Sequence, residues 1–283
     1  MKVVVTGAGP QSIGLATAVA LRDLGHEVLV STRTTPVEGF AWHPLDLADR
    51  GSVAAFADWV LASGGSSGRT SGEGVDALVN NAGIHLDLRA KWTQPQLLDG
   101  YEIHWRTNYL GTMQLTEALL PALLEQAGRT GDARIVHVVS QLHARGRNEY
   151  LFSGVEPYSS WKAYGTTKLA LIHDAVRRNR TYADRGLRAV SAHPGKVLTK
   201  IADGGLANSP VLARLRSVAR PIEKLILLTP EQGAETNVHV VTTSDLVGGG
   251  YYEKSAPQAP SADAQDSSVE QRLWEQTSDW LSA

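Results

Sequence analysis

The chain has 283 residues, of which 42% are hydrophobic, and this length and composition suit one large α/β domain with a buried core. The formal net charge is −2, with acidic and basic residues mixed along the sequence, so neither nucleic acid nor a membrane surface is an expected partner. There is no cysteine, and the nine histidines show no metal-binding spacing, so we expect neither disulfides nor a metal site.

The chain begins with a short apolar run at residues 3–5, which leads into the glycine-rich residues 6–14. This run is too short for a signal peptide, and no later stretch approaches the roughly 18 apolar residues of a membrane span. We therefore expect a cytoplasmic protein. Between residues 13 and 24, apolar side chains recur with helical spacing, and Gly25 follows as a C-cap. This order predicts a strand, a glycine turn and a helix.

Further along the chain, short β-rich runs alternate with helical stretches. The predicted strands are 27–32, 76–80, 134–139 and 188–193, with a further strand ending near Asp46. The predicted helices are 97–127, with a kink at Pro121, then 158–183 and 230–242, with Thr229 as N-cap and Pro230 in the first turn. Residues 63–74 predict a loop, and an amphipathic helix should follow the Pro-, Ala- and Ser-rich residues 256–268. The alternation predicts a parallel sheet covered on both faces, within a single domain.

The glycine turn is a candidate phosphate-binding loop. A strand-to-helix turn with several glycines lets backbone N–H groups approach a pyrophosphate, and the helix N-terminus adds a partial positive charge. Gly7, Gly9 and Gly14 do not have G-x-G-x-x-G spacing, so an ordinary glycine-containing turn is the alternative.

The end of the second strand bears on the choice between NAD and NADP. An acidic residue stands there in NAD-binding sheets, whereas this strand ends in Ser31-Thr32-Arg33. An arginine fork with two hydroxyls beside it suits a 2′-phosphate, so we expect NADP(H), with NAD(H) less favoured. A surface arginine at a strand end is the alternative. Asp46, near the end of the third strand, is a candidate acceptor for the adenine amino group or else a helix cap.

Two tyrosines are followed four residues later by a lysine, a spacing that places each pair on one face of a helix. The pairs are Tyr158 with Lys162 and Tyr164 with Lys168. Upstream, Ser140 ends an apolar strand and Asn108 lies in a predicted helix. Taken alone, Ser140 could be a strand-end cap and Asn108 a helix-kink amide, but the four residue types together can make a proton-transfer site.

The motifs of this sequence resemble those of the short-chain dehydrogenase/reductase family, and within it those of the retinol-dehydrogenase-like branch. The resemblance covers nearly the whole chain. It rests on Thr6-Gly7-Ala8 with Ile13-Gly14, Asn80-Asn81-Ala82-Gly83, Asn108, Ser140 after residues 134–139, Tyr164-x-x-x-Lys168, His193-Pro194-Gly195-Lys196-Val197-Leu198-Thr199, Gly250-Tyr251-Tyr252 and Arg272-Leu273-Trp274-Glu275. The family implies a Rossmann-type doubly wound parallel sheet flanked by helices. One NAD(P)-binding domain would span residues 1–283, with a C-terminal tail and helix at 256–283.

The resemblance also implies roles for individual residues. Tyr164 would be the acid/base, because it precedes Pro194 by 30 residues, similar to the family spacing, whereas Tyr158 would be a substrate-loop or first-turn residue. Lys168 would also hold ribose hydroxyls, Ser140 would hydrogen-bond the substrate oxygen, and Asn108 would hold a water that links the lysine to solvent. The expected cofactor contacts are Gly7, Gly9, Ser12, Ile13, Arg33, Asp46, Leu47, Asn81, Ala82, Gly83, Tyr164, Lys168, Pro194, Gly195, Val197 and Thr199. Pairing of the long helices 97–127 and 158–183 would give a homodimer or homotetramer.

Three features depart from the family pattern. The glycine turn is one residue longer, with Ser12 where the middle glycine is expected, although a serine hydroxyl can also donate to phosphate. Only eleven residues separate Arg33 from Leu45, too few for the usual helix between the second and third strands. Val139 replaces a common first serine, at a position that is not the catalytic one.

Carbonyl reduction needs a hydride from the nicotinamide and a proton for the developing alkoxide. Free tyrosine titrates near ~10, whereas an acid/base works best near the ambient pH. An ammonium ~4 Å from the phenolate, at an effective dielectric of ~20, contributes about 4 kcal/mol. We therefore expect Lys168 to lower the pKa of Tyr164 by roughly three units, to near 7.

The residues between Ser140 and Tyr164 suggest an apolar wall of a substrate pocket. The wall residues are Leu142, Tyr150, Leu151, Phe152, Tyr158 and Trp161, joined by Leu206, Val211, Leu212 and Leu215 after Thr199. We expect an NADP(H)-dependent oxidoreductase that acts on a bulky apolar carbonyl or alcohol. The alternative is a family member that binds NADP(H) without turnover, as a sensor or scaffold. A nucleotide-sugar epimerase would need a larger C-terminal substrate domain.

Overall fold

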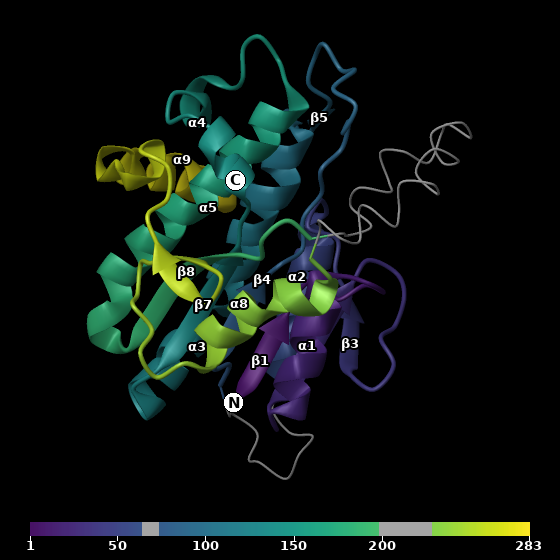
Figure 1. Ribbon diagram of the computed structural model, residues 1–283, viewed down its shortest axis with the longest axis vertical. Helices are drawn as coiled ribbons and strands as arrows, with labels where there is room; N and C mark the ends of the chain where they lie inside the picture. The colour runs from purple at the N-terminus through teal and green to yellow at the C-terminus, as the bar shows by residue number, and fades with distance from the viewer. Residues whose placement is uncertain (64–73, 198–227) are drawn as a thin grey trace.

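The computed structural model describes residues 1–63, 74–197 and 228–283, which form one α/β unit around an eight-stranded sheet (Figure 1). The strand order is β10-β9-β8-β7-β4-β1-β2-β3, and every neighbouring pair is parallel except β9 with β10. The strands are β1 (Lys2–Val5), β2 (Glu27–Thr32), β3 (Ala41–Pro44), β4 (Ala77–Asn80), β7 (Ala133–Val138), β8 (Leu187–His193), β9 (Tyr251–Glu253) and β10 (Ala256–Gln258). The chain winds outward from β1 in one direction and from β4 in the other. The predicted doubly wound fold is confirmed, and ligands bind such sheets at the carboxyl ends of the strands beside this switch point.

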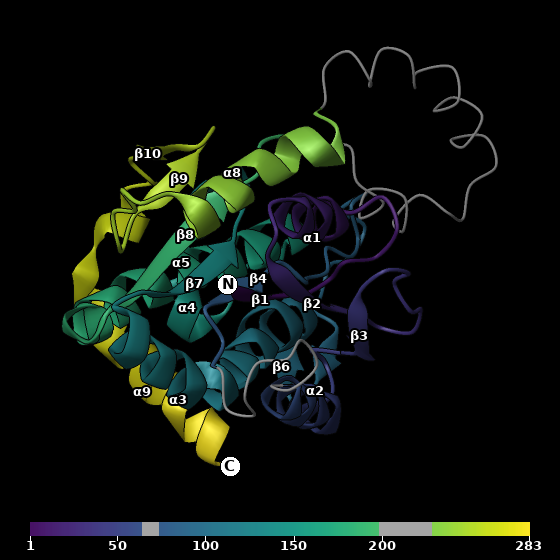
Figure 2. The same ribbon diagram turned by 90° about the horizontal axis from the view of Figure 1, so that it is seen from below.

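Helices cover both faces of the sheet (Figure 2). The helices α1 (Ile13–Asp23) and α8 (Pro230–Thr242) lie on one face; α2 (Arg50–Ala62), α3 (Thr112–Thr130) and α5 (Ser160–Tyr182) lie on the other. Successive side chains of a strand point to opposite faces, so Val3 and Val5 pack in the core under α1 and α8, whereas Val4 packs under α2 and α3. Because both faces are buried, the central strands are apolar throughout.

Most predicted elements are confirmed. The helices predicted at 158–183 and 230–242 correspond to α5 and α8, and Thr229 caps α8 in a capping box with Gln232. Gly25 follows α1 with a positive φ of 85°, as a glycine just past a helix end often does. Residues 33–40, between β2 and β3, contain no helix, as the short spacing predicts.

The helix predicted at 97–127 is wrong at its N-terminal end. The strands β5 (Leu97–Leu98) and β6 (Tyr101–Glu102) form a hairpin there, with Asp99 and Gly100 at φ values of 53° and 80°. Asp-Gly is a strong signal for a tight hairpin turn, and here it outweighed the helical spacing. The helix starts instead at Ile103, passes through the π-helical segment η1 (Trp105–Gly111) and continues as α3, which contains Pro121.

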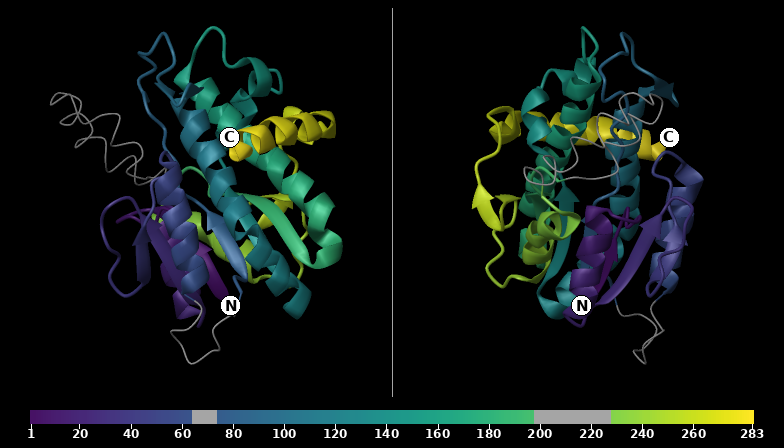
Figure 3. Two further views of the ribbon diagram at one scale, coloured as in Figure 1. Left: turned by 180° about the vertical axis from the view of Figure 1, so that it is seen from behind. Right: turned by 45° about the vertical axis from the view of Figure 1, so that its right-hand side comes forward.

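The last helix, α9 (Glu270–Ser282), lies across η1 and α5 and is seen from behind in Figure 3. The Arg177 guanidinium lies 3.8 Å from the ring centre of Trp274, a cation–π contact. Tyr109 Oη and Thr277 Oγ1 are hydrogen-bonded at 2.9 Å. Thus α9 covers part of the surface through which we expected the long helices to pair between subunits.

Part of the sequence predictions falls on residues that the structure does not describe. These are most of the loop at 63–74, the cofactor contact Thr199 and the wall residues Leu206, Val211, Leu212 and Leu215. Within the described ranges, none of the helices has both the length and the apolarity to cross a lipid bilayer.

Candidate active site

The glycine turn after β1 is fastened to the segment that follows β4. Thr6 Oγ1 accepts from the N–H groups of Asn81 at 3.0 Å and Ala82 at 2.9 Å, and Asn81 Nδ2 donates to the carbonyl oxygens of Thr6 and Gly7. Gly7 has a φ of 73°, and a Cβ there would lie 2.8 Å from Ala82 Cα. At Gly14 a Cβ would lie 2.5 Å from Asn81 Nδ2. The two motifs therefore form one preorganised edge at the switch point.

Ser12 is the N-cap of α1. Its hydroxyl donates to the Gly7 carbonyl oxygen at 3.1 Å and accepts from the Leu15 N–H at 3.0 Å. The hydroxyl proton is thus directed within the turn, and the expected contact of Ser12 with a phosphate stays a prediction. A Cβ at Gly9 would meet no atom within 4 Å, so open space lies beside the N-terminus of α1, where the first N–H groups lack helical partners. This cradle fits the pyrophosphate of a dinucleotide.

The three residues at the end of β2 have different surroundings. Ser31 is buried, and its Oγ accepts a backbone N–H of the glycine turn at 3.3 Å. The Thr32 hydroxyl donates to the Thr35 carbonyl oxygen at 2.5 Å and accepts from Trp42 Nε1 at 3.0 Å. Arg33 is exposed. The Thr32 hydroxyl is therefore occupied by its own loop, and the role expected for Arg33 stays a prediction.

Asp46 and Leu47 follow β3 at the same edge of the sheet. Asp46 Oδ1 accepts from the Ala48 N–H at 2.9 Å, whereas Asp49 is the N-cap of α2. The alternative role of Asp46 as the helix cap is therefore wrong. The Leu47 carbonyl oxygen accepts from Nη1 of the buried Arg106 at 3.0 Å, which fixes this segment against η1.

The residues after β8 approach the glycine turn from the side of α8. A Cβ at Gly233 would lie 2.5 Å from Val197 Cγ2 and 3.5 Å from Ile13 Cγ1, so Val197 and Ile13 are neighbours. Gly195 follows Pro194 with a φ of 82°. The predicted contacts from three distant parts of the sequence thus lie around one turn.

The predicted catalytic residues lie together at the carboxyl end of β7 and the start of α5. Tyr164 and Lys168 are one turn apart on α5, and Lys168 Nζ lies 5.6 Å from the Tyr164 ring centre. The same Nζ donates to the carbonyl oxygen of Val138, the last residue of β7, at 2.9 Å. Ser140 caps the short helix η2 (Gln141–Arg145), because its Oγ accepts a backbone N–H at 3.2 Å. The Ser140 hydroxyl proton can still be donated to a substrate oxygen.

Asn108, in η1, holds the backbone that follows β4. Its Oδ1 accepts from the Ile84 N–H at 2.7 Å and its Nδ2 donates to the Ile84 carbonyl oxygen at 2.8 Å. A Cβ at Gly83 would lie 3.2 Å from Asn108 Oδ1 and 3.7 Å from Lys168 Nζ. The side chain of Asn108 therefore positions this segment, and the water expected between it and Lys168 stays a prediction.

Burial sets the pKa values of the two catalytic candidates. Desolvation raises the pKa of Tyr164 to about 12, and the hydrogen bond with Ser140 lowers it by less. Desolvation likewise lowers the pKa of Lys168 to about 8. The expectation that Lys168 brings the tyrosine pKa near 7 is therefore wrong for the protein alone, because the loss of water around the phenolate dominates. The phenol is protonated at neutral pH.

His85, which is not among the predicted site residues, lies against Tyr164. The imidazole and phenol rings are stacked, with 14° between their planes and 4.4 Å between their centres. The Trp161 ring lies edge-on to the His85 ring, with 85° between their planes and 4.6 Å between their centres. The sequence position of His85 could have indicated this, because it stands two residues after Gly83, in the segment that follows the carboxyl end of a parallel strand.

Tyr158, the other candidate acid/base, precedes α5. Its hydroxyl donates to Glu102 Oε1 at 3.1 Å, and the same carboxylate oxygen accepts from His104 Nδ1 at 2.6 Å. Burial and then the Glu102 charge raise the pKa of Tyr158. Its proton is thus committed to a carboxylate, which agrees with the choice of Tyr164 as the acid/base.

A cavity of about 680 Å³ lies on the other side of α5. Ala163 and Thr166 line it, whereas Tyr164 and Lys168 lie on the opposite face of the helix. Its apolar lining includes Trp105, Leu110, Tyr150, Leu151, Phe152, Tyr158, Leu273 and Trp280. Four of the predicted wall residues therefore do form an apolar wall, but in a cavity directed away from Tyr164. Trp161 is the predicted wall residue that contacts the site, through His85.

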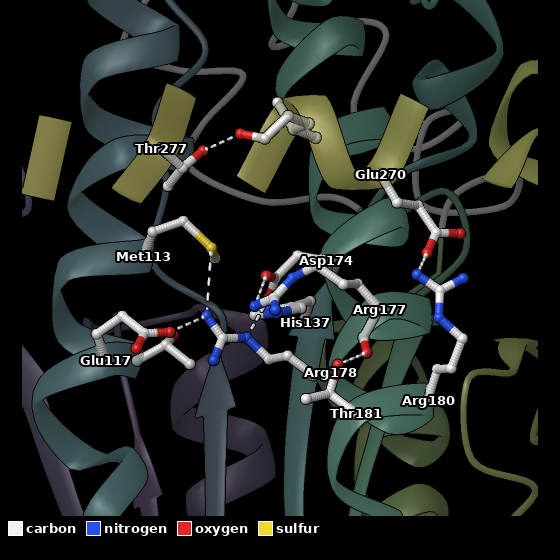
Figure 4. A network of polar contacts seen from close by, with 12 residues as sticks. Met113, Glu117, His137, Asp174, Arg177, Arg178, Arg180, Thr181, Glu270 and Thr277 are labelled. Atoms are coloured by element: carbon white, nitrogen blue, oxygen red, sulfur yellow. Dashed lines mark hydrogen bonds and ion pairs between the residues drawn. The ribbon is translucent and has the colours of Figure 1, made fainter. Parts of the chain in front are cut away.

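A second group of ionisable residues, the Asp174 cluster, lies further along α5 (Figure 4). It consists of Asp174, Arg177 and Arg178 with His137 of β7 and Glu117 of α3. Asp174 Oδ2 accepts from Arg178 Nε at 2.5 Å and from His137 Nε2 at 2.9 Å, and Arg178 Nη2 lies 2.6 Å from Glu117 Oε1. Burial alone would raise the pKa of Asp174, but Arg178, His137 and Arg177 together hold it below its usual value.

The chain matches known proteins over most of its length. A family model described as short chain dehydrogenase matches residues 1–208. Polyprenol dehydrogenase of Mus musculus is 33% identical over 272 residues, which cover 93% of this chain and 75% of that protein. Retinol dehydrogenase 11 of Homo sapiens is 30% identical over 299 residues, which cover 99% of this chain and 85% of that protein.

Among solved structures, an uncharacterized protein from Mycobacterium paratuberculosis has a TM-score of 0.68 and 28% sequence identity, and the match covers 100% of this chain and 93% of that one. The fold, the motifs at the switch point and these matches agree. The chain belongs to the short-chain dehydrogenase/reductase family, oxidoreductases that act on alcohols or carbonyl compounds, and within it to the retinol-dehydrogenase-like branch.

Proposed function

We propose that this protein interconverts a ketone or aldehyde with the corresponding alcohol on a bulky apolar small molecule, with NADP(H) as cofactor and Tyr164 as the acid/base. The observation that carries the proposal is the convergence of Tyr164, Lys168 and Ser140 beside the segment after β4, to which the glycine turn is hydrogen-bonded. The same edge of the sheet offers a cradle that fits a dinucleotide. A bound nicotinamide would supply or accept the hydride.

The residues of the chain supply the proton and the orientation. In the reductive direction, the protonated Tyr164 hydroxyl donates its proton to the substrate oxygen as negative charge develops there. Ser140 donates a hydrogen bond to the same oxygen, which fixes it beside the phenol. Lys168 holds ribose hydroxyls, and its ammonium form favours the phenolate that remains after proton transfer. In the oxidative direction the phenolate takes the alcohol proton.

The preference for NADP(H) rests on Arg33, which is exposed at the end of β2 where an acidic residue would repel a 2′-phosphate. The apolar character of the substrate rests on Trp161 beside His85 and on two relatives named for polyprenol and retinol. The oligomeric state stays a prediction, and a dimer through the long helices would have to form over or around α9. A cytoplasmic location also stays a prediction.

The test compares Tyr164→Phe with Tyr158→Phe in NADPH oxidation driven by a panel of apolar ketones and aldehydes. Loss of the acid/base should reduce kcat by about 10²- to 10⁴-fold in the first variant. The second should remain close to the wild type, because Tyr158 donates to Glu102 and not to the site. Fluorescence titration with NADPH serves as the control for folding and binding. Equal losses in both variants would refute the assignment, and wild-type binding of NADPH without any turnover would favour the sensor alternative.

A further inference from the structure

His85 is held rigidly beside the proposed acid/base. The residue before it is fixed by the two hydrogen bonds of Asn108 to Ile84, and the residue after it by the Leu86 N–H, which donates to His104 Nε2 at 2.9 Å. The imidazole is stacked on the Tyr164 ring and is met edge-on by Trp161. These contacts hold the imidazole against the phenol ring.

One nitrogen of this ring, Nε2, has no hydrogen-bond partner among the described residues. His85 is only 6% exposed, and its Nε2 is buried without a hydrogen bond in the described part of the chain. The neighbouring His104 differs, because its Nδ1 donates to Glu102 and its Nε2 accepts from Leu86. A buried polar atom left unpaired destabilises a fold, so this nitrogen calls for a partner, and a ligand group can supply one.

The imidazole is neutral at physiological pH. Desolvation and then the adjacent His104 lower the pKa of His85 to about 4, and Asp87 opposes this only in part. A neutral imidazole can donate or accept at Nε2, according to its tautomer. It therefore suits a hydroxyl or a carbonyl group and does not require a charged ligand.

We propose that His85 determines substrate specificity by hydrogen-bonding, through Nε2, a second oxygen of the substrate next to the reacting carbon. The inference rests on the proposed function and on the contact of the imidazole with the Tyr164 ring, whose centres lie 4.4 Å apart. Preferred substrates are then apolar molecules that carry a hydroxyl or carbonyl group adjacent to the reacting carbonyl, namely α-hydroxy ketones and 1,2-diketones.

The probes are 2-decanone and 3-hydroxy-2-decanone, which have the same apolar chain and differ in the second oxygen. Wild type should show a higher kcat/KM for the hydroxy ketone, by about five- to a hundredfold. His85→Phe keeps the aromatic stack and removes the nitrogen, so it should abolish this preference; the readout is the ratio of the two kcat/KM values and not either value alone. His85→Gln, which restores a polar group at a similar reach, should recover part of the preference.

Titration calorimetry of both ketones, with wild type and His85→Phe, gives the same comparison without turnover. If His85 has a purely structural role, His85→Phe should lower kcat/KM and affinity equally for both substrates, and this result would overturn the proposal. A wild type with no preference in either kinetics or binding would overturn it as well. Turnover of 2-decanone that is lost in Tyr164→Phe supports the proposed function whatever the result for His85, so the two failures are distinguishable.

Discussion

The helix α5 carries two groups of buried ionisable residues with opposite electrostatics. Near its N-terminus, burial dominates: the pKa of Tyr164 is raised to about 12 and that of Lys168 is lowered to about 8, both toward the neutral form. Two turns further on, burial is outweighed by partners. The pKa of Asp174 is held below its usual value and that of Arg178 above it, so both remain charged.

The difference distinguishes a cluster that stabilises the fold from groups that can take part in the reaction. In the Asp174 cluster, Arg178 has a carboxylate oxygen of Asp174 and one of Glu117 within hydrogen-bond distance. These ion pairs join α5 to α3, and the hydrogen bond between His137 and Asp174 joins α5 to β7. At the active site, Tyr164 and Lys168 are buried without such compensation and therefore titrate away from their ordinary values. Buried groups with perturbed pKa values and no compensating charge, such as Tyr164 and Lys168, are candidates for proton transfer.

The largest expected effect follows removal of the carboxylate from the Asp174 cluster. Asp174→Asn leaves the buried Arg178 without its main partner, so the free energy of unfolding should fall by about 3–5 kcal/mol. Urea unfolding followed by circular dichroism measures it. The matched control is Asp23→Asn, which breaks the ion pair of Arg22 with Asp23 at side-chain exposures of 44% and 63% and should cost at most about 1 kcal/mol. Equal effects in the two variants would show that the cluster is not what stabilises this part of the fold.

The next effect concerns Lys168 and depends on pH. Its pKa is about 8 in the folded protein, against 10.5 for an ordinary lysine. Between these values the unfolded chain binds the extra proton, so burial of Lys168 destabilises the fold at low pH and this penalty disappears as the pH rises. Measured without nucleotide, Lys168→Met should therefore gain stability relative to wild type at pH 7, and the advantage should shrink by about 3 kcal/mol toward pH 10.5.

The useful pH range for this measurement ends near 10. The raised pKa of Tyr164 makes its own contribution fall as the pH increases from 10 toward 12, which is the opposite sign. Unfolding curves of wild type and Lys168→Met at pH 7, 8, 9 and 10 provide the comparison. A constant difference between them would mean that Lys168 keeps an ordinary pKa, and the contrast with the Asp174 cluster would be lost.

The sequence predicted those parts of the molecule that depend on local pattern. Alternating strands and helices led to the doubly wound sheet, and the four-residue spacing placed Tyr164 and Lys168 on one face of α5. The hairpin at Asp99 and Gly100 was also predictable from the Asp-Gly pair, but the helical spacing of the following residues was extended over it.

Contacts between distant residues could not be predicted in this way. His137 and Asp174 meet from a strand and a helix 37 positions apart, and no local pattern links them. The stacking of His85 on Tyr164 likewise depends on how β4 and α5 are placed in three dimensions. Hydroxyl groups were the least predictable, because a serine or threonine serves a ligand or its own backbone according to small differences in geometry. Thr32 and Ser12 illustrate this, since the structure commits both hydroxyls within their own loops.

The smallest of these effects concerns Arg33, an arginine whose surroundings are the reverse of those of Arg178. Arg178 is buried and paired with two carboxylates, whereas Arg33 is exposed at the end of β2. A charge-assisted hydrogen bond to a 2′-phosphate contributes about 1.5–3 kcal/mol, so Arg33→Ala should raise the dissociation constant for NADPH by roughly ten- to a hundredfold. The constant for NADH should stay nearly unchanged, because that cofactor lacks the phosphate.

Fluorescence titration with both nucleotides measures this difference, and Arg188→Ala is the matched control. Arg188 lies at the amino end of β8, away from the site, and pairs with Asp132, so its loss should leave both constants unchanged. Because Ser31 is buried and the Thr32 hydroxyl is taken up by its own loop, Arg33 should account for most of the selectivity. If wild type binds both nucleotides equally, or if Arg33→Ala keeps the preference for NADPH, then Arg33 is an ordinary surface arginine and the proposal of NADP(H) as cofactor fails with it.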